Sequence, residues 1–266
     1  MNKAHEDGWR VFRIMAEFVE GFETMSRVGK AVSIFGSART KPDDPYYKAA
    51  EKTGKLLVKA GYAVITGGGP GIMEAANRGA HEAGGTSVGL NISLPHEQES
   101  NRYINVSMDF HYFYARKVMF VKYASAFICF PGGFGTLDEC FETLTLIQTL
   151  KIQAFPVILF GTKYWTGLVE WMRKQLSPQF IDPEDTGIFR IVDRPKDVVA
   201  IVKEGQKHGW WHPRDRKLEQ MEAAAAKKKG PMASPQAGST GEGTRYGVRP
   251  KRASKKHAAM GTKPTQ

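Results

Sequence analysis

The stretch Ala126-Phe-Ile-Cys-Phe-Pro-Gly-Gly-Phe-Gly-Thr-Leu-Asp-Glu139 changes character twice. Residues 126–130 are apolar and do not alternate with polar residues, which is typical of a strand buried on both faces of a parallel sheet. Pro131 ends this run, glycines follow, and a helical pattern opens at Thr136. The order of strand, tight loop and helix predicts an α/β fold.

The glycines after the proline are suited to binding an anion. Glycine takes positive φ without strain and lets the backbone approach a ligand, and we expect both at Gly132, Gly133 and Gly135. The first N–H groups of the helix have no partner within it and carry the positive end of its dipole. The expected anion contacts are Gly132, Gly133, Phe134, Gly135 and Thr136.

Two acidic residues, Asp138 and Glu139, are expected in the first turn of this helix. Carboxylates suit the helix dipole there, but they would repel a phosphate placed directly on them. They are either ordinary first-turn acids beside a tight turn, or at least one of them has a chemical task. Glu139, Glu142 and Thr145 recur every three residues, so one side of the helix can face a ligand, and Thr145 is a candidate contact.

Another glycine-rich loop, the first of the two along the chain, repeats the same order of elements. The apolar residues 62–66 are followed by Gly67-Gly-Gly-Pro-Gly-Ile-Met-Glu74. Two such loops in one sheet predict a nucleotide-like ligand at the carboxyl edge of the strands. Neither loop fits G-x-G-x-x-G or G-x-x-x-x-G-K-[ST], so a monophosphate is favoured over a dinucleotide or a triphosphate. The candidate contacts of this loop are Gly67, Gly68, Gly69, Gly71 and Glu74.

Two further loops lie at expected carboxyl ends of strands. Ser37, in Gly36-Ser37-Ala38-Arg39, is either a ligand contact or part of a plain turn. The polar connection 93–103 is longer than a simple link needs, and such loops often carry ligand contacts. Its candidate contacts are Glu97 and Asn101.

Strand and helix patterns alternate along most of the chain. Such alternation is typical of a doubly wound, Rossmann-like parallel sheet. We expect strands over residues 31–35, 63–66, 87–92, 105–110, 126–130, 155–161 and 188–192, and helices over residues 46–60, 72–83, 112–123, 136–150, 164–176 and 196–204. The expected organisation is an N-terminal amphipathic helix within residues 1–30, a single Rossmann-like nucleotide-binding domain over 31–212, and a tail over 213–266.

The N-terminal helix has an apolar face that includes Phe12, Met15, Val19 and Phe22. Its polar side is partly acidic, which argues against a role at a membrane surface. We expect this face to cover the sheet or to pack at a subunit interface.

Most of the charge of +11 lies in the tail. Residues 213–266 hold 13 Lys and Arg against 4 Asp and Glu, a net +9, which leaves the folded body at +2. The tail has few large apolar residues and is expected to be disordered. Basic clusters of this kind can touch nucleic acid, but a solvated tail is the commoner outcome and is favoured.

Cysteine and hydropathy patterns indicate a cytoplasmic protein. Cys129 and Cys140 give neither a disulfide framework nor metal-ligand spacing, so no metal and no cofactor are expected. No apolar run reaches the roughly 18 residues of a membrane span, and no cleavable secretory signal is evident.

The combined motifs resemble the Lonely Guy family of cytokinin riboside 5′-monophosphate phosphoribohydrolases, whose members were often labelled lysine decarboxylases. The residues that carry the resemblance are Pro131-Gly-Gly-Phe-Gly-Thr-Leu-Asp-Glu139, the first glycine-rich loop and Arg116-Lys117. Without the resemblance, the simplest interpretation of Arg116 and Lys117 is that they belong to a solvent-exposed helix face. The resemblance implies a catalytic arginine at Arg116, a substrate contact at Lys117, and a homodimer or a larger assembly of dimers.

Two readings of the ligand site follow. The first is a hydrolase that cleaves the N-glycosidic bond of a purine nucleoside 5′-monophosphate, either AMP or a cytokinin riboside monophosphate, with Glu139 as the carboxylate that stabilises an oxocarbenium-like ribose and activates water. The second is a non-catalytic carrier of a nucleotide or of molybdenum cofactor on the same fold. A carrier has no need to keep both Arg116 and Glu139, so their joint presence favours the hydrolase. The sequence leaves the identity of the base open.

Overall fold

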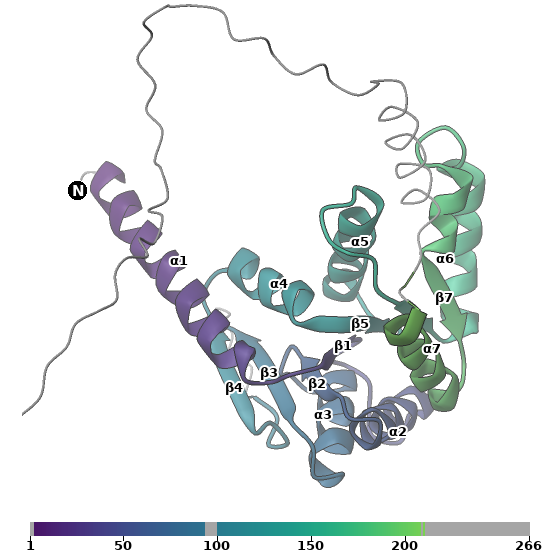
Figure 1. Ribbon diagram of the computed structural model, residues 1–266, viewed down its shortest axis with the longest axis horizontal. Helices are drawn as coiled ribbons and strands as arrows, with labels where there is room; N and C mark the ends of the chain where they lie inside the picture. The colour runs from purple at the N-terminus through teal and green to yellow at the C-terminus, as the bar shows by residue number, and fades with distance from the viewer. Residues whose placement is uncertain (1–2, 94–99, 209, 211–266) are drawn as a thin grey trace, which may run out of the picture. The chain divides into compact units, whose positions relative to one another are not determined.

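The computed structural model describes residues 3–93, 100–208 and 210, all of which belong to one compact unit. These residues contain a parallel sheet of seven strands in the order β4-β3-β2-β1-β5-β6-β7. The strands are β1 (Ala31–Phe35), β2 (Ala63–Thr66), β3 (Ser87–Ile92), β4 (Val106–Phe110), β5 (Ala124–Cys129), β6 (Val157–Phe160) and β7 (Phe189–Val192). The predicted doubly wound α/β fold is confirmed (Figure 1).

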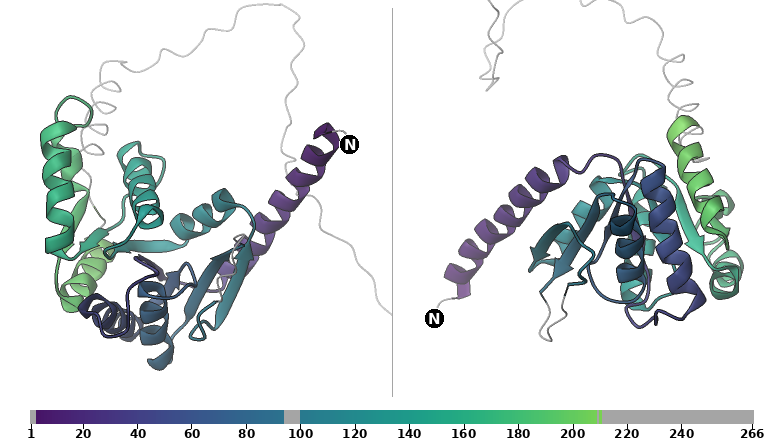
Figure 2. Two further views of the ribbon diagram at one scale, coloured as in Figure 1. Left: turned by 180° about the vertical axis from the view of Figure 1, so that it is seen from behind. Right: turned by 90° about the horizontal axis from the view of Figure 1, so that it is seen from below.

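Helices cover both faces of the sheet (Figures 1 and 2). One face packs against α1 (Lys3–Ser26), α4 (Phe113–Lys122), α5 (Phe134–Gln148) and α6 (Thr162–Gln175). The other packs against α2 (Pro45–Lys59), α3 (Ile72–Glu82) and α7 (Pro195–His208). Strands β1, β2, β5 and β6 are buried between two apolar clusters, which explains why their sequences are largely apolar. The edge strand β4 instead alternates buried Met108 and Phe110 with exposed Ser107 and Asp109.

The strand order reverses direction next to β1. From β1 the chain builds outward through β2, β3 and β4, and it then returns to place β5 on the other side of β1. Loops that leave the carboxyl ends of two strands on either side of such a reversal separate and form a crevice. The loops after β1 and β5 are the predicted Ser37 loop and the predicted second glycine loop, so the topology puts them at the reversal point.

The beginning of α5 differs from the expectation. The helix starts at Phe134 rather than Thr136, so Asp138 and Glu139 lie in its second turn, and the prediction of the first turn was wrong. The predicted positive φ of Gly132, Gly133 and Gly135 was also wrong. Gly133 has φ −91° as the residue that caps the helix, and Gly135 is inside the helix. Apolar Phe134 gave no sign that it would open a helix.

Two predictions concern residues that the structure does not describe. Glu97 and the predicted tail over 213–266 lie outside the described residues, so the limits of the three predicted segments stay predictions. A short 3-10 helix, Pro183–Gly187, was not predicted. Within the described residues, no helix combines the length and the apolar character needed to cross a membrane.

The helix α1 packs on α4 by a face different from the predicted one. Met25 is fully buried, and Phe18 packs beside it against the core. The predicted apolar face points outward instead, where Phe12 is 64% exposed and Val19 is also 64% exposed. Figure 2 shows that the N-terminal half of α1 extends beyond the sheet. The helix therefore has one partnered and one unpartnered apolar face.

Candidate functional site

A cleft of about 710 Å³ opens at the carboxyl ends of β1, β2, β3 and β5. Polar and charged side chains, glycines and a few apolar side chains line it together. Its lining residues are Phe35, Gly36, Ser37, Ala38, Arg39, Gly67, Gly68, Gly69, Met73, Asn91, Ile92, Phe113, Arg116, Gly133, Phe134, Gly135, Thr136, Asp138 and Glu139. A volume of this size is typical of a site for a small molecule.

Ser37 joins the three loops that form the cleft. Its N–H donates to the carbonyl of Pro131 over 2.9 Å, and its own carbonyl accepts from the N–H of Ile72 over 3.0 Å. Gly71, with φ +69°, passes so close to this loop that a Cβ atom there would lie 2.7 Å from the carbonyl carbon of Ala38. The loops after β1, β2 and β5 are thus fixed to one another, which preorganises the cleft.

The start of α5 presents unpaired N–H groups to the cleft. The first N–H that bonds within the helix is that of Leu137, which donates to the carbonyl of Gly133 over 3.1 Å. The N–H groups of the three preceding residues, Phe134, Gly135 and Thr136, precede this first bond and line the cleft. Together with the helix dipole they form a site suited to an anion.

Glu139 and Arg116 supply opposite charges to the same cleft. Glu139 is 7% exposed, and its Oε2 atom is buried without a hydrogen-bond partner among the described residues. The Nε atom of Arg116 is also buried and has no hydrogen-bond partner among the described residues. The NH2 group of the same side chain donates to the carbonyl of Gly67 over 3.4 Å. Buried charged groups that lack partners are costly, so both are ready to bind a ligand.

Burial shifts the protonation of both groups. It raises the pKa of Glu139 to about 7, an effect that the positive charge of Lys117 opposes and the negative charge of Glu142 reinforces. Burial also lowers the pKa of Arg116 to about 10, against the attraction of Glu139. A carboxyl group with a pKa near neutrality can exchange protons at physiological pH, which is the requirement for general acid–base chemistry.

Asn101 supports the first glycine loop from behind. Its side-chain amide donates to the carbonyls of Gly68 and Gly69 over 2.9 and 3.1 Å, and to the Oδ1 atom of Asn77 over 3.0 Å. Asn77 is fully buried and also accepts from the hydroxyl of Thr66 over 2.5 Å. This polar network holds the loop in place, and sequence reasoning missed Asn77 because a lone asparagine within a helix carries no pattern.

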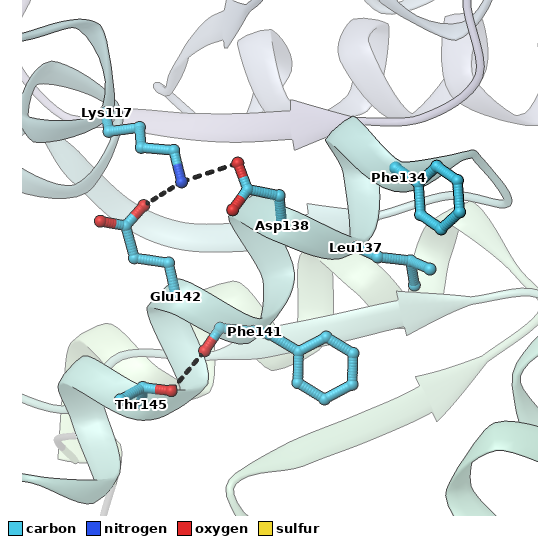
Figure 3. Close-up of a pocket in the computed structure, with 7 residues that line it drawn as sticks. All are labelled: Lys117, Phe134, Leu137, Asp138, Phe141, Glu142 and Thr145. Carbon is cyan, nitrogen blue, oxygen red and sulfur yellow. Dashed lines mark hydrogen bonds and ion pairs between the residues drawn. The ribbon is translucent and has the colours of Figure 1, made fainter. Parts of the chain in front are cut away.

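A separate groove lies on the outer side of α4 and α5 (Figure 3). Lys117 bridges Asp138 and Glu142 there, with distances of 2.7 and 3.0 Å from its Nζ atom. Burial alone would lower the pKa of Lys117, but these two carboxylates raise it. The hydroxyl of Thr145 donates to the carbonyl of Phe141 over 2.8 Å. Lys117 and Thr145 therefore lie outside the cleft, although Asp138 lines both sites.

Most of the predicted contacts meet in the cleft. Those that line it are Ser37, Gly67, Gly68, Gly69, Arg116, Gly133, Phe134, Gly135, Thr136 and Glu139. Those in the described chain that do not line it are Gly71, Glu74, Asn101, Gly132, Lys117 and Thr145. Glu74 instead accepts from the hydroxyl of Tyr47 over 3.2 Å, and the carbonyl of Gly132 accepts from the hydroxyl of Tyr164 over 2.6 Å.

Several lining residues were not predicted. Arg39 adds a charged side chain two positions after Ser37, and its place at the end of a strand was the only available signal. Met73, the neighbours Asn91 and Ile92, and Phe113 come from three different segments that only the folded chain brings together. The described residues contain no group of three or more His, Cys, Asp or Glu side chains that could hold a metal ion.

Comparisons with known proteins find relatives that match about two thirds of the chain. The family described as possible lysine decarboxylase matches residues 73–202. A probable cytokinin riboside 5′-monophosphate phosphoribohydrolase of Oryza sativa is 31% identical over 187 residues, covering 68% of this chain and 74% of the relative. A cytokinin riboside 5′-monophosphate phosphoribohydrolase of Arabidopsis thaliana is 30% identical over 188 residues, covering 68% and 84% of the two chains.

Solved structures give weaker matches. The molybdenum cofactor binding protein of Rippkaea orientalis has a TM-score of 0.49 and 22% identity, covering 66% of this chain and 94% of that protein. The molybdenum cofactor carrier protein of Chlamydomonas reinhardtii has the same TM-score of 0.49 and the same identity of 22%, covering 66% and 97% of the two chains.

Proposed function

The chain belongs to the Lonely Guy family of cytokinin riboside 5′-monophosphate phosphoribohydrolases, as its motifs predicted, and we propose that it hydrolyses the N-glycosidic bond of a purine nucleoside 5′-monophosphate. The products are the free base and ribose 5-phosphate. The proposal extends to this chain the reaction for which its relatives are named. Its support within the molecule is a cleft that combines an anion site with a buried carboxyl group.

The start of α5 holds the 5′-phosphate in this proposal. Phe134, Gly135 and Thr136 line the cleft, and their backbone N–H groups can donate hydrogen bonds to a phosphate bound there. The helix dipole also favours negative charge at this end of the helix. Because Glu139 is in the second turn of the helix, the phosphate and the carboxylate are separated along the helix axis by about one turn, or about 5 Å. The phosphate therefore binds without lying directly on the carboxylate.

Glu139 and Arg116 carry the reaction. As the bond between C1′ and the base nitrogen breaks, positive charge develops on the ribose, and the Glu139 carboxylate stabilises it. The same carboxylate accepts a proton from the water that attacks C1′, while the departing base nitrogen takes up a proton. Arg116 binds ribose or phosphate oxygens and fixes the ribose relative to Glu139.

The observation that carries the proposal is the burial of the Glu139 carboxyl group and its raised pKa. A first-turn or surface acid would be solvated, whereas Glu139 is buried beside a ligand-sized cleft with an unpaired oxygen and a pKa of about 7. An ordinary structural carboxylate at this depth would be paired. A carrier has no need of such a group, so the hydrolase is favoured over the non-catalytic carrier.

Two substrates test the proposal directly. Purified full-length protein is incubated with AMP and with isopentenyladenosine monophosphate, and free base and ribose 5-phosphate are followed by chromatography. We expect release from at least one, and the ratio of the two rates identifies the preferred base. Glu139→Gln should lower the rate by about 10² or more. The control Glu170→Gln, on the exposed side of α6, should keep the wild-type rate. Binding of nucleotide without release would replace the hydrolase with the carrier.

We also propose that the partner of this protein is a second copy of itself, which covers the outward face of α1. The exposed side chains of that face recur at the spacing of a helix–helix seam.

Both cysteines are free and buried, which suits a protein of the reducing cytoplasm, and we propose that compartment for this chain.

A further inference from the structure

The side chain of Glu17 in α1 reaches the first residues before α4. Its Oε1 atom accepts from the backbone N–H of His111 over 2.8 Å, and its Oε2 atom accepts from the N–H of Tyr112 over 3.3 Å. The Glu17 side chain is only 11% exposed. The imidazole Nδ1 of His111 also lies 3.1 Å from Oε1. More than ninety residues of chain separate these partners, so the contact is a tertiary one.

This contact supplies a cap that α4 lacks. Tyr112 caps the helix by position, but its own side chain makes no capping hydrogen bond. No acidic residue lies in the first turn of α4 either. A carboxylate that accepts from the N–H of the N-cap residue makes one half of a capping box and interacts favourably with the helix dipole. Glu17 supplies this contact from a neighbouring helix, because it accepts from the N–H of the cap residue Tyr112 and of His111 before it.

The cap is connected to Arg116 through one residue. The backbone N–H of Tyr112 donates to Glu17, and the carbonyl of Tyr112 accepts from the N–H of Arg116 over 3.3 Å. The position of Tyr112 therefore sets where the first turn of α4 begins, and with it the origin of the Arg116 side chain.

The helix α1 also holds the other end of α4. The hydroxyl of Tyr123 donates to the carbonyl of Phe22 over 3.2 Å. Between the two ends, Gly21 lies so close to Met119 that a Cβ atom at Gly21 would be 2.7 Å from the Met119 methyl carbon. The two helices are thus in contact at the start of α4, at Met119 and at the end of α4.

We propose that Glu17 is a positioning residue, which caps α4 from α1 and so fixes Arg116 in the cleft. The inference rests on the proposed hydrolase function, because it assigns Glu17 to the placement of an arginine that acts in that reaction. Glu17 touches neither the cleft nor the ligand, so it acts only through α4. The N-terminal helix, which lies outside the matched residues 73–202, becomes a working part of the site.

The test compares two glutamates on the same helix. Glu17→Ala removes the cap, whereas Glu20→Ala removes an exposed carboxylate that has no ion pair or hydrogen bond with the described residues. Steady-state hydrolysis of the preferred nucleotide should show kcat lowered about tenfold or more by Glu17→Ala, because a small misplacement of a catalytic group is costly. KM should change less than kcat, since the phosphate site on α5 is untouched and only the substrate oxygens bound by Arg116 are affected. Glu20→Ala should change neither.

A second readout separates this inference from the proposed function. Amide hydrogen exchange over residues 112–117 should become faster in Glu17→Ala and stay unchanged in Glu20→Ala, whether or not the protein hydrolyses nucleotides. Glu17→Gln keeps one acceptor oxygen and should recover part of both losses, which also covers the case in which Glu17→Ala folds poorly. Equal kcat in Glu17→Ala and Glu20→Ala would overturn the proposal, and so would unchanged exchange over 112–117 in Glu17→Ala. If wild-type protein lacks hydrolysis while the exchange responds, the hydrolase proposal fails and the cap stands.

Discussion

Glu139 is 7% exposed, and burial raises its pKa to about 7. The proposed reaction uses the ionised carboxylate, whose fraction grows as pH rises through the pKa. We therefore predict that kcat/KM increases from pH 5.5 to pH 8 with a midpoint of about 7, and then levels off. The substrate phosphate titrates at about 6 and can itself shape the pH profile. The ionisation of the Glu139 carboxyl group is therefore also measured directly, as the infrared difference spectrum between wild type and Glu139→Gln over the same pH range. A carboxyl group that titrates near 4.5, its ordinary value, would contradict the prediction.

The same shift makes the stability of the protein depend on pH. The folded state holds the Glu139 proton more tightly than the unfolded state, so this stabilisation is complete below the unfolded pKa of 4.5 and is lost as pH rises through about 7. Glutamine does not titrate, so Glu139→Gln does not lose this stabilisation. We predict that the unfolding free energy of Glu139→Gln minus that of wild type is about 2 to 3 kcal/mol larger at pH 8 than at pH 5. Urea denaturation of both proteins at both pH values measures this gain. A constant difference between the two proteins would show that the carboxyl group is not desolvated.

At the scale of elements, two glycines beside α5 have different tasks. A Cβ atom at Gly132 would lie 2.7 Å from Cβ of Thr136 and 3.0 Å from the backbone N of Ser37. A Cβ atom at Gly135 would meet nothing within 4 Å, and Gly135 lines the cleft. Gly132 is thus required by packing, and we expect Gly135 to give a ligand access to the start of the helix.

This difference predicts stability changes of opposite sign. Gly132→Ala should destabilise the protein by about 1 to 3 kcal/mol, because a methyl group is forced between fixed loops. Gly135→Ala should be neutral or stabilise it by up to about 1 kcal/mol, since alanine is the better helix former. Gly135→Ala should nevertheless weaken nucleotide binding, because its methyl group enters the anion site. Thermal denaturation and nucleotide titration of the two variants check this, and a Gly135→Ala variant with wild-type affinity would remove Gly135 from the site.

Alternating patterns of strands and helices predicted the elements well, because the central strands are buried on both faces and the helices bury one face. The start of α5 was misplaced since Phe134, which is 91% exposed, looks like an apolar core residue and not like the first residue of a helix. The cleft residues near β1, β2 and β5 were predicted because glycine loops follow those strands. Asn91 and Phe113 were missed because they join the cleft only through the order of the strands, which local patterns do not contain.

At the scale of the whole molecule, α1 exposes an unusually apolar face. Its side chains Trp9, Val11, Phe12, Met15, Val19 and Phe22 are between 38% and 68% exposed. With typical side-chain areas they expose on the order of 600 Å², at the upper limit for the largest apolar patch of a monomer, and close to the roughly 800 Å² that each partner contributes to a standard interface. Phe12, Met15, Val19 and Phe22 follow the spacing 3-4-3 of a two-helix seam.

This seam predicts that two copies associate through α1. The double variant Phe12→Asp/Val19→Asp should halve the mass of the assembly in solution, because it places charges in the middle of the seam, and its fold should be unchanged since both side chains are exposed. Light scattering after size-exclusion chromatography measures the mass. The control Arg13→Asp changes the charge of the same helix by the same amount, but at an exposed position outside the seam, and should keep the wild-type mass. An unchanged mass in the first variant would contradict the pairing. Sedimentation of wild type, but not of that variant, with phosphatidylcholine vesicles would instead assign the face to a lipid surface.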